Sequence, residues 1–428
     1  MDILIKNGRI VDPTQKINKK GDILIKNGKI AKISAEIKET CSTTIDAKGK
    51  LVVPGFIDMH THLREPGRED KETIETGLLA AVSGGFTTVC AMPNTEPPCD
   101  GQANVKFLLE RAKQVQLANL LPIGTITKGR DGEKLTEMGE LKQAGCLAVS
   151  DDGDSVPDSG LMRRALEYAS MMDLLVIDHC EDKELAGDGV MHEGYWSTVL
   201  GMKPIPAESE ATIVERDIRL AELAGARLHI AHVSAAASVD IIRQAKKRGV
   251  NVTAEVTPHH FSLTDEDVKT FDANMKVNPP LRSAEDVKAL KEGLKDGTID
   301  VIATDHAPHL ESEKEKEFDY APFGMIGLET ALSLAVTNLV NEGYLDWPGL
   351  IEKLAANPAK ILKYDRGTLK EGAPADITVI APAVEWDYTK ENIRSLSKNS
   401  PFIGRRMTAA VTEVLVGGKL VIKAGKPA

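Results

Sequence analysis

The sequence contains little cysteine and no CxxC pair. Its five cysteines, at positions 41, 90, 99, 146 and 180, are odd in number and irregular in spacing. This argues against a disulfide framework and a structural zinc knot, and it favours a reducing compartment. No run approaches the ~18 consecutive apolar residues that a membrane-spanning helix requires. The N-terminus, MDILIKNG, lacks the basic and then apolar pattern of a signal peptide. We therefore expect a cytoplasmic protein.

Positive charge is also in deficit. The chain has 53 lysine and arginine residues against 64 aspartate and glutamate residues, a formal net charge of −11. Because an acidic surface repels phosphate backbones, we expect no nucleic-acid partner. The 428 residues, 42% of them hydrophobic, suffice for a large core and two or three domains. The composition favours a soluble enzyme.

The two ends of the chain share a β-rich pattern. The heptapeptide DILIKNG occurs at residues 2–8 and again at 22–28, and each copy predicts a strand that stops at an Asn-Gly turn. Near the C-terminus, residues 375–382 predict one strand, and residues 409–425 predict two strands around Gly417-Gly418. We expect residues 1–53 and 366–428 to form one small β-sandwich domain.

Between these ends, apolar runs typical of strands buried on both faces alternate with helical stretches. Expected helices include residues 104–116 and 240–248. The two longest gaps, after the fifth and the seventh run, are expected to be functional loops on the catalytic rim. Eight β-α units match the size of a (β/α)8 TIM barrel, predicted over residues 54–365. The eight runs begin at Gly55, Thr87, Ala118, Cys146, Leu174, Arg227, Val250 and Ile299.

Polar residues gather where these runs end, which is the face that carries the active site in barrel enzymes. His60 and His62 are two apart on a strand, so both imidazoles face the same way. The other strand ends supply Asp151-Asp152, Asp178-His179, His232 and Asp305-His306. Nitrogen and oxygen donors without thiolates suit zinc. Their number predicts two metal ions that share a bridging carboxylate, an arrangement typical of hydrolases.

The motifs resemble those of a known family. GFIDMHTHLREPG (residues 55–67), AMPNT (91–95), SDDG (150–153), DHCED (178–182), HIAHVS (229–234), KVNPPLR (276–282), ATDHAPH (303–309) and GTLKEGAPADITV (367–379) strongly resemble the dihydroorotases of the amidohydrolase superfamily. The resemblance is to the long bacterial type I form and covers essentially the whole chain. It implies reversible hydrolysis of L-dihydroorotate to N-carbamoyl-L-aspartate, the third step of pyrimidine synthesis.

The resemblance also implies a metal site. His60, His62 and Asp305 would hold a first zinc ion, His179 and His232 a second, and Asp152 would bridge the two. Two zinc ions per subunit are expected, although some relatives hold one. Asp305 would be the catalytic residue that takes a proton from the attacking water and passes it to the leaving nitrogen. The residues alone leave open whether Asp151 or Asp152 is the bridge.

The substrate-binding set follows from the same resemblance. Arg64, Asn94 and His309 would bind the substrate carboxylate, and Asn278 with the backbone of Phe323-Gly324 would hold the ring. His62 and Leu63, which directly precede Arg64, complete the expected set. A homodimer and a complex with aspartate carbamoyltransferase are left open.

Two alternatives remain at this point. Another cyclic amidohydrolase (a hydantoinase, dihydropyrimidinase or allantoinase) would share the metals but lack Arg64 in its LREPG setting. A non-catalytic scaffold for aspartate carbamoyltransferase would be expected to have lost metal ligands. Among the remaining histidines, His229 is expected to pack in the interior, and the pair His259-His260 matches no ligand position. Residues 311–319 are expected to form a solvated loop or a lid over the site.

Overall fold

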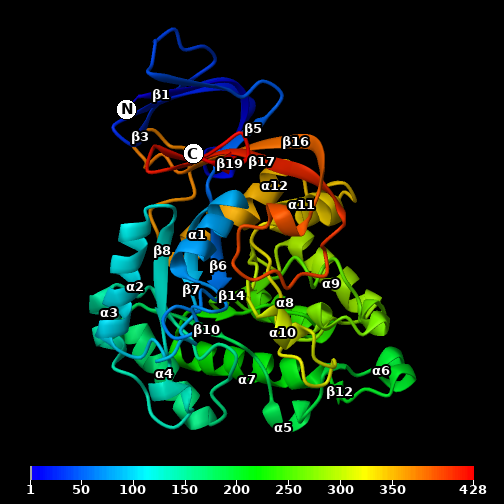
Figure 1. Cartoon of the computed structure of the whole chain (residues 1–428). Helices are drawn as coiled ribbons and strands as arrows, with labels where there is room; N and C mark the ends of the chain where they lie inside the picture. The colour runs from blue at the N-terminus through cyan, green and yellow to red at the C-terminus, as the bar shows by residue number, and fades with distance from the viewer. Residues whose placement is uncertain (1) are drawn as a thin grey trace.

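The structure, a computed structural model, describes residues 2–428 (Figure 1). Its larger part is a barrel of eight parallel strands in sequence order, and the edge strands β6 and β15 are joined through a bridge between Thr61 and His306. All eight predicted runs form strands, so the predicted TIM barrel is confirmed. The strands are β6 (Phe56–Thr61), β7 (Phe86–Ala91), β8 (Asn119–Gly124), β9 (Ala148–Val149), β10 (Leu175–Asp178), β13 (Leu228–Ile230), β14 (Val252–Val256) and β15 (Val301–Ile302).

Helices follow the barrel strands and cover them. In α2 (Gln102–Val115), Val105, Leu108 and Ala112 lie on one face and are buried, as the sequence period predicts. Among residues 2–428, no helix combines the length and the apolar character needed to cross a membrane. The other main helices are α1 (Ile74–Ser83), α3 (Met138–Ala144), α4 (Ser159–Met171), α7 (Glu208–Ala224), α8 (Ala236–Lys247), α9 (Ala284–Asp296), α11 (Ala331–Ala335), α12 (Trp347–Ile351) and α13 (Asn357–Leu362).

The long connections carry short elements of their own. Between β10 and β13 lie α5 (Lys183–Ala186), β11 (Met191–His192), α6 (Tyr195–Leu200) and β12 (Pro204–Ile205), and between β14 and β15 lie η3 (Asp265–Thr270) and η4 (Ala273–Met275). The segment after β15 contains α10 (Glu311–Lys314). The remaining helical turns are η1 (Pro13–Gln15), η2 (Lys128–Arg130), η5 (Val336–Val340), η6 (Glu352–Ala356) and η7 (Lys390–Asn392).

Both chain ends contribute to a second, mostly antiparallel sheet above the barrel in Figure 1, with the two termini at the same end of the molecule. The strand order is β19-β18-β17-β16-β5-β1-β2-β3, and β4 pairs with β1. β16 pairs with β5, so the C-terminal strands join the N-terminal ones as expected. The strands are β1 (Ile3–Asp12), β2 (Ile17–Lys26), β3 (Lys29–Ser34), β4 (Thr43–Asp46), β5 (Leu51–Pro54), β16 (Ile377–Asp387), β17 (Arg406–Val416), β18 (Lys419–Lys423) and β19 (Lys426–Pro427).

The two copies of DILIKNG behave differently, and the prediction for the first copy is wrong. β1 continues through Asn7-Gly8 as far as Asp12, with a register shift between Ile5 and Gly8. Asn7 has a φ of 64°, and its N–H donates to Asp22 Oδ1 across the sheet at 2.9 Å, so the dipeptide forms a bulge. Only the second copy makes the expected turn, between β2 and β3.

Candidate active site

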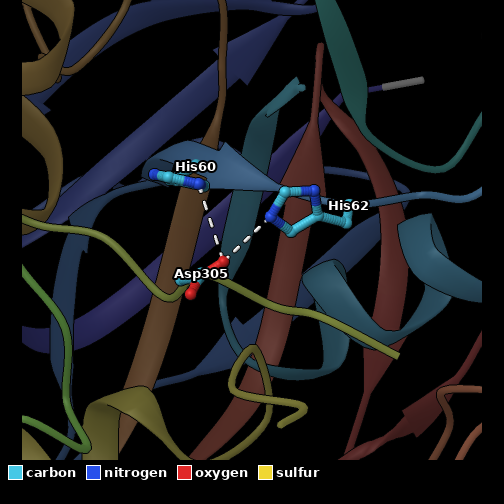
Figure 2. A group of neighbouring side chains, drawn as sticks. All are labelled: His60, His62 and Asp305. Carbon is cyan, nitrogen blue, oxygen red and sulfur yellow. Dashed lines mark hydrogen bonds and ion pairs between the residues drawn. The ribbon is translucent and has the colours of Figure 1, made fainter. Parts of the chain in front are cut away.

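The six predicted metal ligands converge at the end of the barrel strands. His60 Nε2 lies 3.1 Å from Asp152 Oδ1, and His62 Nε2 lies 2.9 Å from Asp305 Oδ1. Figure 2 shows the His60 and His62 rings turned toward the Asp305 carboxylate. His179 Nδ1 and His232 Nε2 are 2.9 Å apart, and they lie 3.8 and 3.7 Å from Asp152 Oδ1. Asp152 therefore contacts both the His60/His62 pair and the His179/His232 pair.

This cluster suits a metal. Two of its buried polar atoms, His60 Nε2 and Asp152 Oδ1, face each other at 3.1 Å without forming a hydrogen bond, and neither has another partner among residues 2–428. This is costly in an interior unless another species binds them. Asp151 points elsewhere: its carboxylate accepts from the backbone N–H groups of Ile126 and Thr127 at 2.8 and 3.0 Å. The geometry thus places Asp152, and not Asp151, among the candidate ligands.

Second partners fix which nitrogen of each ring faces the cluster. His60 Nδ1 lies 2.7 Å from Glu255 Oε1, and His62 Nδ1 lies 2.8 Å from Asn94 Oδ1. Each contact holds the proton on Nδ1 and leaves Nε2 as a lone-pair donor for a metal. Burial would raise the pKa of Glu255, but His60 and His229 outweigh it and lower that pKa to about 2. Glu255 is therefore ionised and is a strong acceptor for the His60 ring.

The sequence analysis did not single out Glu255. The sequence feature that could have identified it is a lone acidic residue in the apolar strand β14, where an unpaired buried charge would be costly in free energy. His229, predicted to pack in the interior, is buried as expected, and its Nε2 lies 3.1 Å from Glu255 Oε2. It therefore supports the carboxylate that orients His60. His259 and His260 are also buried, and neither is among the residues grouped as metal ligands.

One cavity of about 230 Å³ brings the predicted site residues together. Leu63 and His60 are the exceptions. The Leu63 side chain is buried in the hydrophobic core, where it packs against Gly77, and His60 is fully buried and does not line the cavity. Gly153 and Ala307, which were not predicted, also line the cavity. The predicted residues that line it are His62, Arg64, Asn94, Asp152, His179, His232, Asn278, Asp305, His309, Phe323 and Gly324.

Comparison with known proteins decides the family. A family model described as "Dihydro-orotase-like" matches residues 49–238. Curated relatives named dihydroorotase, from Geotalea daltonii and Pelotomaculum thermopropionicum, are each 54% identical to this chain; the alignments cover 99% of it and 100% and 99% of the relatives. The chain belongs to the dihydroorotase family. The family resemblance drawn from the motifs is confirmed.

Solved structures outside the dihydroorotase family share the whole fold. An L-hydantoinase (dihydropyrimidinase) from Arthrobacter aurescens matches with a TM-score of 0.89 at 29% identity, covering 100% of this chain and 97% of its own. A D-hydantoinase matches with a TM-score of 0.85 at 26% identity and covers 100% and 96%. The fold is thus shared with hydantoinases, and it does not by itself distinguish the dihydroorotase family from them.

Arg64 is the main cation of the dihydroorotase-family cavity. Its Nε donates to the carbonyl of Pro308 at 3.2 Å, and its Nη2 lies 3.4 Å from His309 Nε2. Burial lowers its pKa to about 10, so the guanidinium is still charged at neutral pH. Among residues 2–428, no carboxylate forms a close ion pair with it, although Asp305, Asp152 and Glu313 attract it from a greater distance. A half-buried guanidinium that has no close ion-pair partner favours an anionic ligand.

Three residues of the cavity have left-handed backbone conformations that non-glycine residues seldom adopt. The φ values are 60° for Arg64, 31° for His232 and 47° for Asp305. Each lies just beyond the end of a barrel strand, where the chain turns sharply and directs the side chain into the cavity. Such conformations cost about 1–3 kcal/mol each and concentrate at functional sites.

Residues 311–319, expected to be a solvated loop or a lid, belong to a segment (310–322) that two lysines anchor to the neighbouring connection. Lys276 Nζ donates to the carbonyls of Phe318 and Asp319 at 2.8 and 3.0 Å. Lys314 Nζ donates to the carbonyls of Ala273 and Pro322 at 2.9 and 2.7 Å. Burial lowers the pKa of Lys314 to about 7. The segment therefore packs against the residues that lead to Asn278, beside the cavity.

Proposed function

We propose that this chain catalyses the reversible hydrolysis of L-dihydroorotate to N-carbamoyl-L-aspartate with zinc bound at the histidine and aspartate cluster. Membership of the dihydroorotase family supports the reaction. The observation that supports this substrate is the composition of the cavity, which joins metal-ligand candidates to the cation of Arg64. A cyclic amide that bears one carboxylate could place its amide at the metal-ligand candidates and its carboxylate at Arg64.

The ligand assignment rests on the contacts around Asp152. His60, His62 and Asp305 would hold one zinc ion, His179 and His232 a second, and Asp152 would bridge them. When bound, zinc polarises the ring amide and makes a water nucleophilic near neutral pH. Glu255 and Asn94 would keep the His60 and His62 rings in the orientation that binding requires.

Asp305 is proposed as the proton carrier. Burial alone would raise its pKa, but His62, whose Nε2 lies 2.9 Å from Oδ1, and the neighbouring histidines outweigh burial and lower it. The carboxylate is therefore ionised at neutral pH and able to accept a proton from the attacking water. Delivery of that proton to the departing ring nitrogen completes hydrolysis, and the reverse transfer serves ring closure.

The substrate carboxylate would bind Arg64, Asn94 and His309. Asn94 Oδ1 accepts from His62, so its Nδ2 is free to donate to an anion. Burial and the Arg64 cation lower the pKa of His309, which keeps its ring neutral. Asn278, Phe323 and Gly324 would hold the ring, and Leu63 would contribute through its backbone.

The test compares two substrates in one variant. Arg64→Met should weaken the use of dihydroorotate strongly, because losing one partner of a buried charge pair costs about 2–5 kcal/mol. Uncharged dihydrouracil should be affected much less. Arg68→Met is the matched control, since Arg68 is more exposed and pairs with Asp70 outside the cavity. Equal losses on both substrates in Arg64→Met would show that Arg64 is structural and has no part in substrate recognition.

Metal dependence needs a separate measurement. Chelation should abolish dihydroorotate turnover and added zinc should restore it, and metal analysis of the same sample gives the number of ions per subunit. Full activity in metal-free protein would exclude the proposed site. A cytoplasmic location, a homodimer and a complex with aspartate carbamoyltransferase stay predictions from the sequence.

A further inference from the structure

The segment between η7 and β17 reaches from the terminal sheet to the rim of the barrel. Four of its polar residues are buried: Ser395, Ser397, Asn399 and Ser400. The Ser395 hydroxyl donates to the Glu72 carboxylate, and the Ser397 hydroxyl donates to the carbonyl of Lys71 at 2.7 Å. A stretch that belongs by sequence to the terminal strands is thus fixed to the loop that follows Arg64.

Asn399 uses its whole side-chain amide on the chain around the cavity. Its Oδ1 accepts from the His309 N–H at 3.0 Å. Its Nδ2 donates to the carbonyls of Ala307 at 3.0 Å and Gly324 at 3.2 Å. Because a backbone N–H faces the oxygen and two carbonyls face the nitrogen, the orientation of the amide is unambiguous.

These partners lie at the two ends of one segment. Ala307 and His309 precede the loop 310–322, and Gly324 follows it. The Asn399 carbonyl also accepts from the Ile326 N–H at 3.0 Å. The two ends are packed closely, since a Cβ on Gly324 would lie 2.8 Å from Ala307 Cβ and 3.2 Å from His309 Cδ2. Asn399 therefore holds together both ends of a loop whose flanking residues line the cavity.

We propose that Asn399 is a positioning residue that sets the distance between the His309 ring and the Gly324 backbone, and so shapes the substrate-binding half of the cavity. The inference rests on the proposed function, in which His309 and Gly324 contact substrate. Asn399 does not line the cavity, and its hydrogen bonds go to none of the six candidate metal ligands. It acts through the loop ends alone.

If Asn399 positions the substrate-binding groups, its loss should change KM more than kcat. Asn399→Ala leaves the His309 N–H and two carbonyls without buried partners, and misplacement of binding groups weakens substrate binding sharply. We expect KM for dihydroorotate to rise about tenfold or more while kcat changes less than about threefold. Bound metal should be unchanged. Hydrogen exchange of the loop-end amides, including those of His309 and Ile326, should become at least about tenfold faster without substrate present.

Two further variants separate positioning from general damage. Asn399→Asp keeps the acceptor for His309 but turns a second oxygen toward two carbonyls, so it should behave no better than Asn399→Ala. Ser397→Ala removes one buried hydrogen bond from the same segment, the bond to the carbonyl of Lys71. Ser397 makes no hydrogen bond to the ends of the loop 310–322, so the KM of this variant should stay within about twofold of the wild type. If Asn399→Ala does not fold, Asn399→Ser, which retains one donor, takes its place.

Each outcome is decisive. Faster exchange at the loop ends together with a raised KM supports the proposal. Unchanged exchange overturns it, whatever the kinetics, because the loop ends would then not depend on Asn399. Faster exchange with an unchanged KM also overturns it, and would argue against His309 and Gly324 as substrate contacts. Wild-type protein that does not turn over dihydroorotate would instead refute the proposed function.

Discussion

Among residues 2–428, the side chains with the geometry to hold a metal form two clusters. The first group combines two overlapping triads, His60/His62/Asp305 and His60/Asp152/His232, and the second group contains Asp178, Cys180 and Asp217. His179 belongs with the first group by its contacts, although it lies between Asp178 and Cys180 in sequence. Successive residues of an extended chain point to opposite sides. β10 therefore leads into both groups.

The second group differs from the first in charge and in access. Asp217 accepts two hydrogen bonds from Arg216, at 2.8 and 3.2 Å, so a cation already neutralises this group. Burial and the neighbouring Asp178 raise the pKa of Asp217, and burial raises the pKa of the Cys180 thiol. None of the three lines the cavity of the first group. Three donor atoms close together therefore do not define a metal site; a route from solvent and an uncompensated negative charge are also needed.

The largest effect is expected at Asp305, in the first group. Asp305→Asn removes both the proposed proton carrier and a candidate metal ligand, so hydrolysis and ring closure should each fall by about 10²–10⁴-fold. In the wild type, hydrolysis should accelerate and ring closure should slow as pH rises. Hydrolysis starts with deprotonated groups, whereas ring closure needs a proton delivered to the substrate carboxylate. Initial rates in both directions from about pH 5.5 to 9.5, with zinc content measured throughout, test this. Near-normal rates in the variant would remove Asp305 from the mechanism.

The sequence was sufficient for the barrel and for the convergence of its strand ends. Apolar runs revealed each strand, and the two-residue period placed His60 and His62 on one face. The family motifs then indicated Asp152 and Arg64, which the structure places in the same cavity. These successes share one property: the signal lies within a few residues of the feature that it predicts.

The features that the sequence did not reveal depend on distant contacts. Glu255 meets His60 across 195 positions, and Asn399 meets His309 across 90. Nothing in the local pattern of either residue names its partner. The bulge at Asn7 was missed for a related reason, since its N–H donates to Asp22, 15 positions away on the next strand. Such contacts follow only from the assembled fold.

A smaller effect is expected at Glu255, which contacts the His60 ring of the first group. Glu255→Gln keeps the size of the side chain but removes the charge that holds the proton on His60 Nδ1. Loss of such a supporting carboxylate commonly lowers metal affinity about 10–100-fold. Competition with a chromophoric chelator measures this directly, without an activity assay. Glu181→Gln is a useful control, because Glu181 Oε2 lies 3.8 Å from His179 Nε2 and supports that ring less closely. Unchanged affinity in Glu255→Gln would mean that His60 needs no such partner.

The smallest effect is expected in the second group, where the test asks whether these residues bind metal at all. If Asp178, Cys180 and Asp217 hold no metal, Asp217→Asn should leave the zinc content and the kcat of the enzyme nearly unchanged.

The consequence of Asp217→Asn should be a change in the pH dependence of the unfolding free energy. The pKa of Asp217 is raised in the folded chain, so the folded state keeps a proton that the unfolded state releases above about pH 4. Stability conferred by this group is therefore lost as pH rises from there toward the folded-state pKa. Asparagine carries no such proton, so the fall in unfolding free energy between about pH 5 and 8 should be shallower in the variant than in the wild type. Denaturant unfolding across that range measures the slope, with metal analysis at each pH. A variant that lost about one zinc ion per subunit would show that the second group binds metal after all.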